Sequence, residues 1–137
     1  KYSEIVKIKG LANVFILGHK EKKLIPGYLS ASDALLMPNV PISDESKYYT
    51  SPIKMFEYMA SHVPIIASDL PSLTEVLNKD NSLLIEPGSA NKIEEAISLL
   101  VKNKDKNRLI SDKAFDDVKV YSWDNQVRLI YRFLETL

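Results

Sequence analysis

A lysine, Lys54, lies in the first turn of a predicted helix that follows Ser51-Pro52. The start of a helix carries free N–H groups and the positive end of the helix dipole, so a lysine there costs about 0.3–1 kcal/mol unless an anion is close by. Ser51 is a suitable N-cap and Pro52 suits the first helical position. The amides of Ile53 and Lys54 then point out of the helix start. Together with the lysine charge, they favour an anion such as a diphosphate.

An ordinary helix start is the alternative. Ser51 would accept a hydrogen bond from one free amide, water would bind the others, and Lys54 would pair with Glu57 three residues on. Such a pair is worth a few tenths of a kcal/mol. Local physics leaves both interpretations open.

Glu57 is the second residue that could contact a ligand. At 100° per residue, the apolar side chains of the helix fill one arc, and Glu57 borders it. That arc contains Ile53, Met55, Phe56, Met59 and Ala60. A carboxylate at the border of a packed face is placed to accept two hydroxyl hydrogen bonds, as from a ribose diol.

Other polar residues have simpler interpretations. His19 follows an apolar run and could line a ligand, although a lone surface histidine is more often only solvated. His62 is expected in a turn, and Ser72-x-x-Glu75 is first a capping box and only second a ligand contact. Tyr121 and Trp123 are expected to pack in the core or to dock the last helix.

Composition excludes several classes of function. The 137 residues are 45% hydrophobic, enough for one compact domain, and 18 basic residues balance 18 acidic ones. Because neither basic nor acidic residues are in excess, the composition does not favour nucleic acid as a partner. The sequence has no cysteine and therefore no thiolate zinc site, and its histidine and acidic residues do not have the spacing of a metal site. It also lacks the G-x-S-x-G motif of a hydrolase. No apolar run approaches the roughly 18 residues of a membrane span.

These residues must be positioned by alternating strands and helices. Four short apolar runs, at residues 14–18, 34–37, 64–67 and 82–85, are typical of buried parallel strands covered on both faces. Helices are predicted at residues 23–32, 53–62, 72–77, 91–103, within 106–120, and at 123–137, after a short polar helix end at 2–9. An Asn91-x-x-Glu94 capping box is expected to open the fourth of these, and Ser122 the last.

The pattern predicts a doubly wound α/β fold over residues 1–137, as a single domain. Ligands of such sheets bind beyond the carboxyl ends of the strands, where three loops qualify, at residues 18–23, 38–50 and 68–71. The second is long enough to suggest a functional or mobile loop. Four strands are few for two layers of helices, so further strands are expected upstream.

Four stretches resemble, in order, the C-terminal half of GT-B glycosyltransferases of the retaining, group 1 type, which include sucrose and glycogen synthases and bacterial capsule and lipopolysaccharide enzymes. They are NVFILGHKEKKLIPGYLSASDALLMPN, SPIKMFEYMASHVPIIASDLPSLTEVL, SLLIEPGSANKIEEAISLLVKN and YSWDNQVRLIYRFLE. The resemblance covers nearly the whole chain. It implies a Rossmann-like domain that binds a nucleotide-sugar donor.

The resemblance also implies roles for individual residues. Gly18, His19 and Lys20 match the loop that holds the base, and Glu57 matches the carboxylate that grips the ribose. The turn formed by Thr50, Ser51, Pro52, Ile53 and Lys54 matches the turn that holds the diphosphate and sugar in relatives. Lys54 is the candidate to stabilise the leaving group. Relatives carry two glutamates spaced E-x₇-E. Tyr49 stands where the first is expected, so Thr50, Ser51 and Lys54 would take over its contact, or the enzyme would be weak or selective for an unusual sugar.

By the same resemblance, the donor is a UDP-, GDP- or ADP-sugar, and neither a metal nor another cofactor is required. An N-terminal domain, absent from this chain, would bind a saccharide or lipid-linked acceptor, and the last helix, at residues 123–137, would pack toward it. The full-length enzyme is expected in the cytoplasm, with peripheral association at the inner face of the membrane, in polysaccharide or glycolipid synthesis. The isolated domain is expected to be inactive.

Two alternatives stay open at this point. A catalytically inactive α/β binding or interaction module would keep the scaffold, with Tyr49 as its sign. A nucleotide-sugar epimerase would require acid and base groups that cannot be assigned in this sequence.

Overall fold

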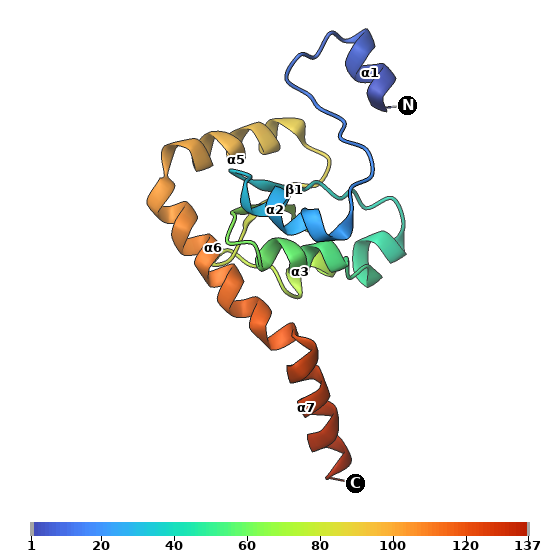
Figure 1. Cartoon of the computed structure of the whole chain (residues 1–137), viewed down its shortest axis with the longest axis vertical. Helices are drawn as coiled ribbons and strands as arrows, with labels where there is room; N and C mark the ends of the chain where they lie inside the picture. The colour runs from blue at the N-terminus through green and yellow to red at the C-terminus, as the bar shows by residue number, and fades with distance from the viewer. Residues whose placement is uncertain (1, 137) are drawn as a thin grey trace.

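A computed structural model describes residues 2–136 of the chain (Figure 1). Its helices and strands alternate along the middle of the chain, as the sequence predicts. In chain order the elements are α1 (Tyr2–Ile8), η1 (Lys22–Leu24), α2 (Ile25–Ser30), β1 (Leu35–Met37), η2 (Glu45–Tyr49), α3 (Ile53–Met59), β2 (Ile65–Ser68), α4 (Pro71–Thr74), β3 (Leu83–Ile85), α5 (Ala90–Lys102), α6 (Lys104–Val118), η3 (Lys119–Tyr121) and α7 (Trp123–Leu134).

The sheet has three parallel strands in the order β1-β2-β3. Leu35 pairs with Ile65, and Ile66 pairs with Leu83, so each strand is aligned with the next along the chain. Strands this short and apolar need cover on both faces. The predicted class, a parallel α/β sheet flanked by helices, is confirmed.

Helices cover both faces of β2. Ile65 and Ala67 join a core formed with α3, α4 and α6, whereas Ile66 packs with Ala96 and Leu100 of α5. Adjacent strand residues point to opposite faces, so the continuous apolar run of β2 serves two cores at once. In Figure 1, α5 accordingly lies on the opposite side of the strands from α3.

Residues 14–18 do not form the predicted strand. They have no strand structure, and Phe15 is 77% exposed. An apolar run becomes a strand only where a neighbour exchanges backbone hydrogen bonds with it, and within residues 2–136 this run has no such neighbour. The sheet therefore has three strands instead of the expected four.

Two predicted caps are wrong and one is confirmed. Ser89, not Asn91, caps α5, because its side chain accepts a hydrogen bond from the amide of Lys92. The helix at residues 72–77 is reduced to the single turn of α4, and no side chain caps it. Ser122 caps α7 by accepting from the amide of Asn125.

The last helix, α7, extends away from the sheet, as Figure 1 shows in red. Its apolar side chains lie in solvent: Trp123 is 85% exposed and Ile130 is 57% exposed. Trp123 is therefore not part of the core. Tyr121, just before α7, does pack, with its ring centroid 5.1 Å from that of Phe56.

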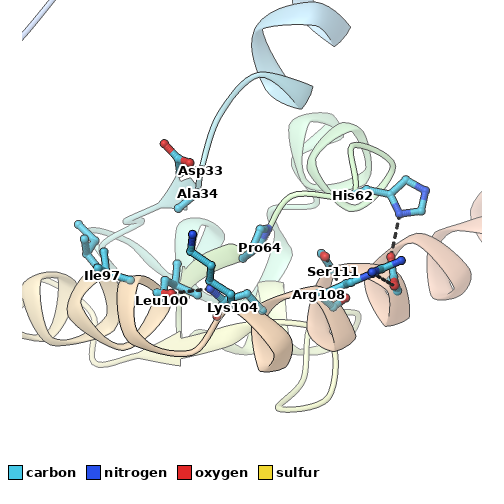
Figure 2. A pocket seen from close by; sticks show the side chains of 12 residues that line it. Asp33, Ala34, His62, Pro64, Ile97, Leu100, Lys104, Arg108 and Ser111 are labelled. Atoms are coloured by element: carbon cyan, nitrogen blue, oxygen red, sulfur yellow. Dashed lines mark hydrogen bonds and ion pairs between the residues drawn. The ribbon is translucent and has the colours of Figure 1, made fainter.

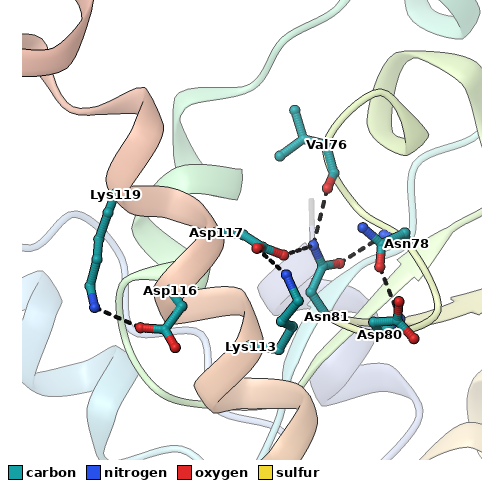
Figure 3. A network of polar contacts seen from close by, with 8 residues as sticks. All are labelled: Val76, Asn78, Asp80, Asn81, Lys113, Asp116, Asp117 and Lys119. Atoms are coloured by element: carbon teal, nitrogen blue, oxygen red, sulfur yellow. Dashed lines mark hydrogen bonds and ion pairs between the residues drawn. The ribbon is translucent and has the colours of Figure 1, made fainter.

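A polar cluster ties the turn before β3 to α6 (Figure 3). Asn81 is fully buried; its side chain accepts from the amide of Asn78 at 2.7 Å and donates to the carbonyl of Val76 at 3.1 Å and to Asp117 at 2.9 Å. Lys113 also pairs with Asp117. Both polar atoms of the Asn81 side chain are thus used in holding this turn, as a buried amide requires.

Candidate functional site

The predicted residues Thr50 to Lys54 follow the carboxyl end of β1 along the chain. β1 ends at Met37 and β2 at Ser68, and the chain leaves these ends through residues 38–52 and through α4. The buried hydroxyl of Ser68, at this edge, has no hydrogen-bond partner among the described residues. Sequence reasoning did not single it out.

The start of α3 differs in one detail from the prediction. Pro52, not Ser51, occupies the N-cap position, with φ −74° and ψ 124°, and no side chain caps the helix. Pro52 fits there because its carbonyl accepts the amide of Met55 at 2.9 Å without needing an N–H of its own. The hydroxyl of Ser51 is thus not used as a cap. The amides of Ile53 and Lys54 belong to a first turn without partners inside the helix.

Lys54 and Glu57 do not pair with each other. Within residues 2–136 no ion pair joins them, and both side chains are exposed. The ion-pair interpretation of Lys54 is therefore not the arrangement that the structure has. The lysine charge stands in solvent beside the uncapped helix start.

The packed face of α3 lies further round the helix than the sequence suggests. Met55 and Met59 are fully buried and Tyr58 packs beside them, whereas Ile53 is 77% exposed. At about 100° per residue, Ile53 and Glu57 share the side that points away from Met55. Glu57 thus faces outward and does not border the core. Burial, and after it the Glu57 charge, raises the pKa of Tyr58.

On that outward side, Glu57 lines a cavity of about 470 Å³ between α2 and α3. Lys22, Ile25 and Pro26 contribute the opposite wall. The volume is that of a typical small-ligand cleft, and the lining combines apolar side chains with one carboxylate and one ammonium group. Such a cavity suits a flat, partly polar group.

A smaller cavity of about 220 Å³ lies along the residues that precede the helix start. It is lined by Tyr48, Tyr49, Thr50, Ser51, Ser72 and Glu75. The predicted residues Thr50 and Ser51 thus share a cavity with two residues of the α4 region. Sequence analysis assigned Ser72 and Glu75 to a capping box; instead, the Ser72 hydroxyl donates to the carbonyl of Ser46 at 3.2 Å.

The loop before α3 is ordered by its own hydroxyl groups. η2 is a short π-helix, a geometry that often occurs at functional sites. Thr50 donates to the carbonyl of Glu45 at 2.9 Å, and the Ser46 hydroxyl accepts from the amide of Ser43 at 3.0 Å. The backbone bond within Glu45 and a bond from Ser43 lower the pKa of Glu45. These contacts hold the walls of the smaller cavity.

Gly18, His19 and Lys20 lie apart from these cavities. None of them lines a described pocket, and His19 is exposed. Gly18 has φ +66°, a conformation that glycine adopts without strain. Lys20 lies two residues before Lys22, which does line the cavity beside Glu57.

A cavity of about 910 Å³ lies at the opposite edge of the sheet (Figure 2). It opens between the amino ends of β1 and β2, near Asp33 and Pro64, and the α5–α6 junction, near Lys104. None of the predicted site residues lines it. We therefore place the candidate site at the carboxyl edge, where Thr50 to Lys54 follow β1, and not at this cavity.

His62 lines both that cavity and the one beside Glu57, and it also has a structural role. It adopts φ 57°, as expected of a turn residue, and its ring stacks on Phe115 at 3.7 Å. Its Nδ1 lies 3.1 Å from Asp112. These contacts fasten the end of α3 to α6.

Two searches of residues 2–136 gave no candidates. No group of three or more histidine or acidic side chains is arranged to hold a metal ion. None of the described helices combines the length and apolar character needed to cross a bilayer.

Comparison with known proteins gives a consistent result for the fold. The family model described as "Glycosyl transferases group 1" matches residues 1–103. No curated protein sequence matches the chain significantly.

Among solved structures, sucrose-phosphate synthase from Thermosynechococcus elongatus superposes with a TM-score of 0.78 at 23% identity, over 98% of this chain and 34% of that one. Anabaena HepE in complex with UDP-glucose gives 0.76 at 20% identity, over 99% and 36%. The C-terminal domain of LpcC, a group 1 family protein from Francisella tularensis, gives 0.67 at 23% identity, over 86% and 58%. The chain thus spans about a third of the length of the first two.

Proposed function

The chain belongs to the group 1 glycosyl transferases, and from this membership we propose that it binds the nucleotide-diphosphate sugar of a sugar transferase. The observation that carries the proposal is the family match, because residues 1–103 include every predicted contact residue from Gly18 to Glu57. The fold likeness to HepE, whose structures hold UDP or UDP-glucose, supports it.

In this proposal the donor lies along the start of α3 and the cavity between α2 and α3. The diphosphate would lie at the uncapped start of α3, held by the amides of Ile53 and Lys54 and by the lysine charge. The nucleoside would enter the cavity between α2 and α3, where Glu57 accepts hydrogen bonds from the ribose. Contact of Gly18, His19 and Lys20 with the base stays a prediction from the family resemblance.

This arrangement also suggests how transfer is assisted. Negative charge grows on the diphosphate as the bond to the sugar breaks, so groups that bind it more strongly in the transition state accelerate the step. Lys54 is exposed, within reach of solvent and of a ligand at the helix start. We assign it the stabilisation of the leaving group, a role that needs no metal ion.

The remaining roles concern parts of the protein outside this chain. A second domain would bind a saccharide or lipid-linked acceptor, and the exposed apolar face of α7 would pack toward it. That face is broad, with Trp123, Val127 and Ile130 all in solvent. Synthesis of polysaccharide or glycolipid, in the cytoplasm or at the inner face of the membrane, is the setting proposed for the whole enzyme.

Titration of the isotope-labelled protein with UDP, GDP and ADP, followed by NMR, tests the proposal. We expect one of them to shift the amide signals of Ile53 and Lys54. Lys54→Ala should weaken that diphosphate about tenfold or more, in line with the loss of a charge-assisted hydrogen bond. Lys104→Ala is the matched control, because Lys104 also begins a helix but lies at the opposite edge of the sheet.

The outcomes separate the candidate functions. If none of the three diphosphates perturbs Ile53 or Lys54 in the folded protein, the proposal is wrong. Binding without any transfer or donor hydrolysis by the full-length protein would favour the inactive binding module instead.

A further inference from the structure

The turn between α3 and β2 contains a residue in a strained backbone conformation. His62 adopts φ 57°, in the left-handed region where glycine is relaxed and any other residue is strained by its side chain. Within residues 2–136, no other residue except glycine has a positive φ. Such strain persists only where the surrounding contacts require it, and it is frequent at functional sites. The contacts of His62 therefore outweigh the strain.

The side chain of His62 is held by two contacts with α6. Its ring stacks on that of Phe115, with 3.7 Å between the centroids, and its Nδ1 lies 3.1 Å from the carboxylate of Asp112. Figure 2 shows the ring directed toward α6, with the bond to Asp112 drawn as a dashed line. An ionised carboxylate can only accept a hydrogen bond, so Nδ1 carries the hydrogen. The turn after α3 is thus attached to a helix 50 positions further along the chain.

This turn also forms part of the wall of the cavity beside Glu57. The residues of that wall that come from α3 and the turn after it are Glu57, Ala60, Ser61 and His62. Because α3 ends at Met59, three of these four belong to the turn. The rest of the lining comes from α2 and the residues just before it. The position of the turn therefore sets the width of the cavity between α3 and α2.

The turn depends on His62 because it has little other support. Met59 before it and Val63 after it are buried, but His62 itself lines two cavities, that beside Glu57 and that of about 910 Å³. A segment that borders cavities lacks packed neighbours on those sides. The hydroxyl of Ser61 donates to the carbonyl of Tyr58, within α3 itself. Within residues 2–136, the bond of His62 is the only side-chain hydrogen bond that joins the turn to another element.

We propose that His62 is a positioning residue for nucleoside binding: held by Asp112 and Phe115, it keeps the turn after α3 at the distance from α2 that the nucleoside requires. The inference rests on the proposed function, because that function assigns the nucleoside to the cavity beside Glu57. It extends the function to two residues of α6 that do not line this cavity. A wall that is fixed before binding loses less freedom when the ligand enters, so the contacts of His62 increase affinity without touching the diphosphate.

NMR titration with two ligands tests the inference. One is whichever of UDP, GDP and ADP binds the unchanged protein; the other is inorganic pyrophosphate, which can occupy the start of α3 but has no nucleoside. His62→Gly should weaken binding of the nucleoside diphosphate about tenfold, the order expected for the loss of a hydrogen-bonded contact. It should change the affinity for pyrophosphate less than about twofold. Glycine is relaxed at this φ, so the variant loses the side chain without gaining backbone strain.

A second variant acts from outside the cavity. Asp112→Ala removes the hydrogen-bond partner of His62 and leaves the cavity lining unchanged, so it should weaken the nucleoside diphosphate about fivefold. Asp112 also lies 3.7 Å from Arg108, and Arg108→Ala controls for the loss of that pair. Lys79→Gly, in an exposed turn before β3, controls for the introduction of a glycine. Both controls should bind as the unchanged protein does.

Weaker binding of the nucleoside diphosphate alone, in both variants, supports the inference. If both ligands are weakened equally, or neither is, the positioning role is refuted while the proposed function stands. An effect of His62→Gly without one of Asp112→Ala would refute the role of α6. Thermal unfolding checks that each variant is folded, and should His62→Gly be unfolded, Asp112→Ala decides alone. Failure of UDP, GDP and ADP to bind the unchanged protein would refute the proposed function, and this inference with it.

Discussion

The hydroxyl of Ser72 donates a hydrogen bond of 3.2 Å to the backbone carbonyl of Ser46, across 26 positions of sequence. Ser72 belongs to α4, which follows the central strand, and Ser46 to the π-helical segment that precedes α3. This bond joins the two segments that line the small cavity, so the shape of that cavity depends on it.

Ser72→Ala should loosen η2 without unfolding the domain. One hydrogen bond is worth about 0.5–1.5 kcal/mol, and Ser46 can turn its carbonyl to water once the partner is gone. Hydrogen exchange at residues 45–49 should accelerate. Ser111→Ala is the control, because among residues 2–136 the hydroxyl of that buried serine bonds to Arg108 of the same helix and not across the fold. Unchanged exchange in Ser72→Ala would mean that the loop is held by other contacts.

Glu57→Gln should reduce discrimination between ribose and deoxyribose. If the carboxylate accepts hydrogen bonds from both ribose hydroxyls, the unchanged protein binds UDP, or whichever diphosphate it prefers, more tightly than the 2′-deoxy form. The charged acceptors contribute about 1.5–3 kcal/mol, so the preference should fall about tenfold or more in the variant. Calorimetry measures both affinities. A preference that persists in Glu57→Gln would place the ribose elsewhere.

Asn81→Ala should destabilise the fold strongly for a single polar residue. The side chain is fully buried and bonded to Asn78, Val76 and Asp117, and its removal leaves these groups unsatisfied in the interior. We expect a loss of about 2–4 kcal/mol in the free energy of unfolding, measured with urea. Asn91→Ala, at an exposed position of α5, should change it by less than about 0.5 kcal/mol. Similar losses in both variants would contradict the stabilising role of the Asn81 side chain.

Acid should weaken the same cluster. Burial alone would raise the pKa of Asp117, but hydrogen bonds from Lys113 and Asn81 outweigh it and hold the pKa below its ordinary value of 3.8. A depressed pKa in the folded state means that the stabilisation is present above pH 3.8 and is lost as the pH falls through the folded value. The free energy of unfolding should thus decline below about pH 4, and less steeply in Asp117→Asn. Equal slopes in both proteins would show that Asp117 titrates normally.

Two substitutions by alanine should separate the core from the apolar face of α7. Leu100 is 6% exposed and packs between α5 and the sheet, whereas Ile130 is 57% exposed. In a protein of residues 1–137, Leu100→Ala should cost about 2–5 kcal/mol in the free energy of unfolding, and Ile130→Ala less than about 0.5 kcal/mol. Thermal or urea unfolding gives both values. A large loss in Ile130→Ala would show that α7 packs on the domain.

The sequence by itself determined the features that depend on neighbouring residues. Short apolar runs alternating with helical patterns predicted parallel strands between two helical layers, because each residue of such a run is buried on one face or the other. The Ser51-Pro52 turn predicted the start of the helix that carries Lys54 to within one residue, and Ser122 the cap of α7. Those rules operate over four or five positions, so one chain segment is enough to apply them.

The tertiary structure decided whatever depends on a partner far away in the chain. Residues 14–18 have a strand pattern but no strand beside them, and Ile53 is apolar but lies where nothing covers it. Ser72 and Glu75 fit a capping box, yet one bonds to Ser46 and the other lines a cavity with Tyr49. A local sequence pattern shows which interactions a residue is able to form. Only the packed fold determines which groups meet it, because hydrogen bonds and cavities form between segments whose distance in sequence carries no information about their distance in space.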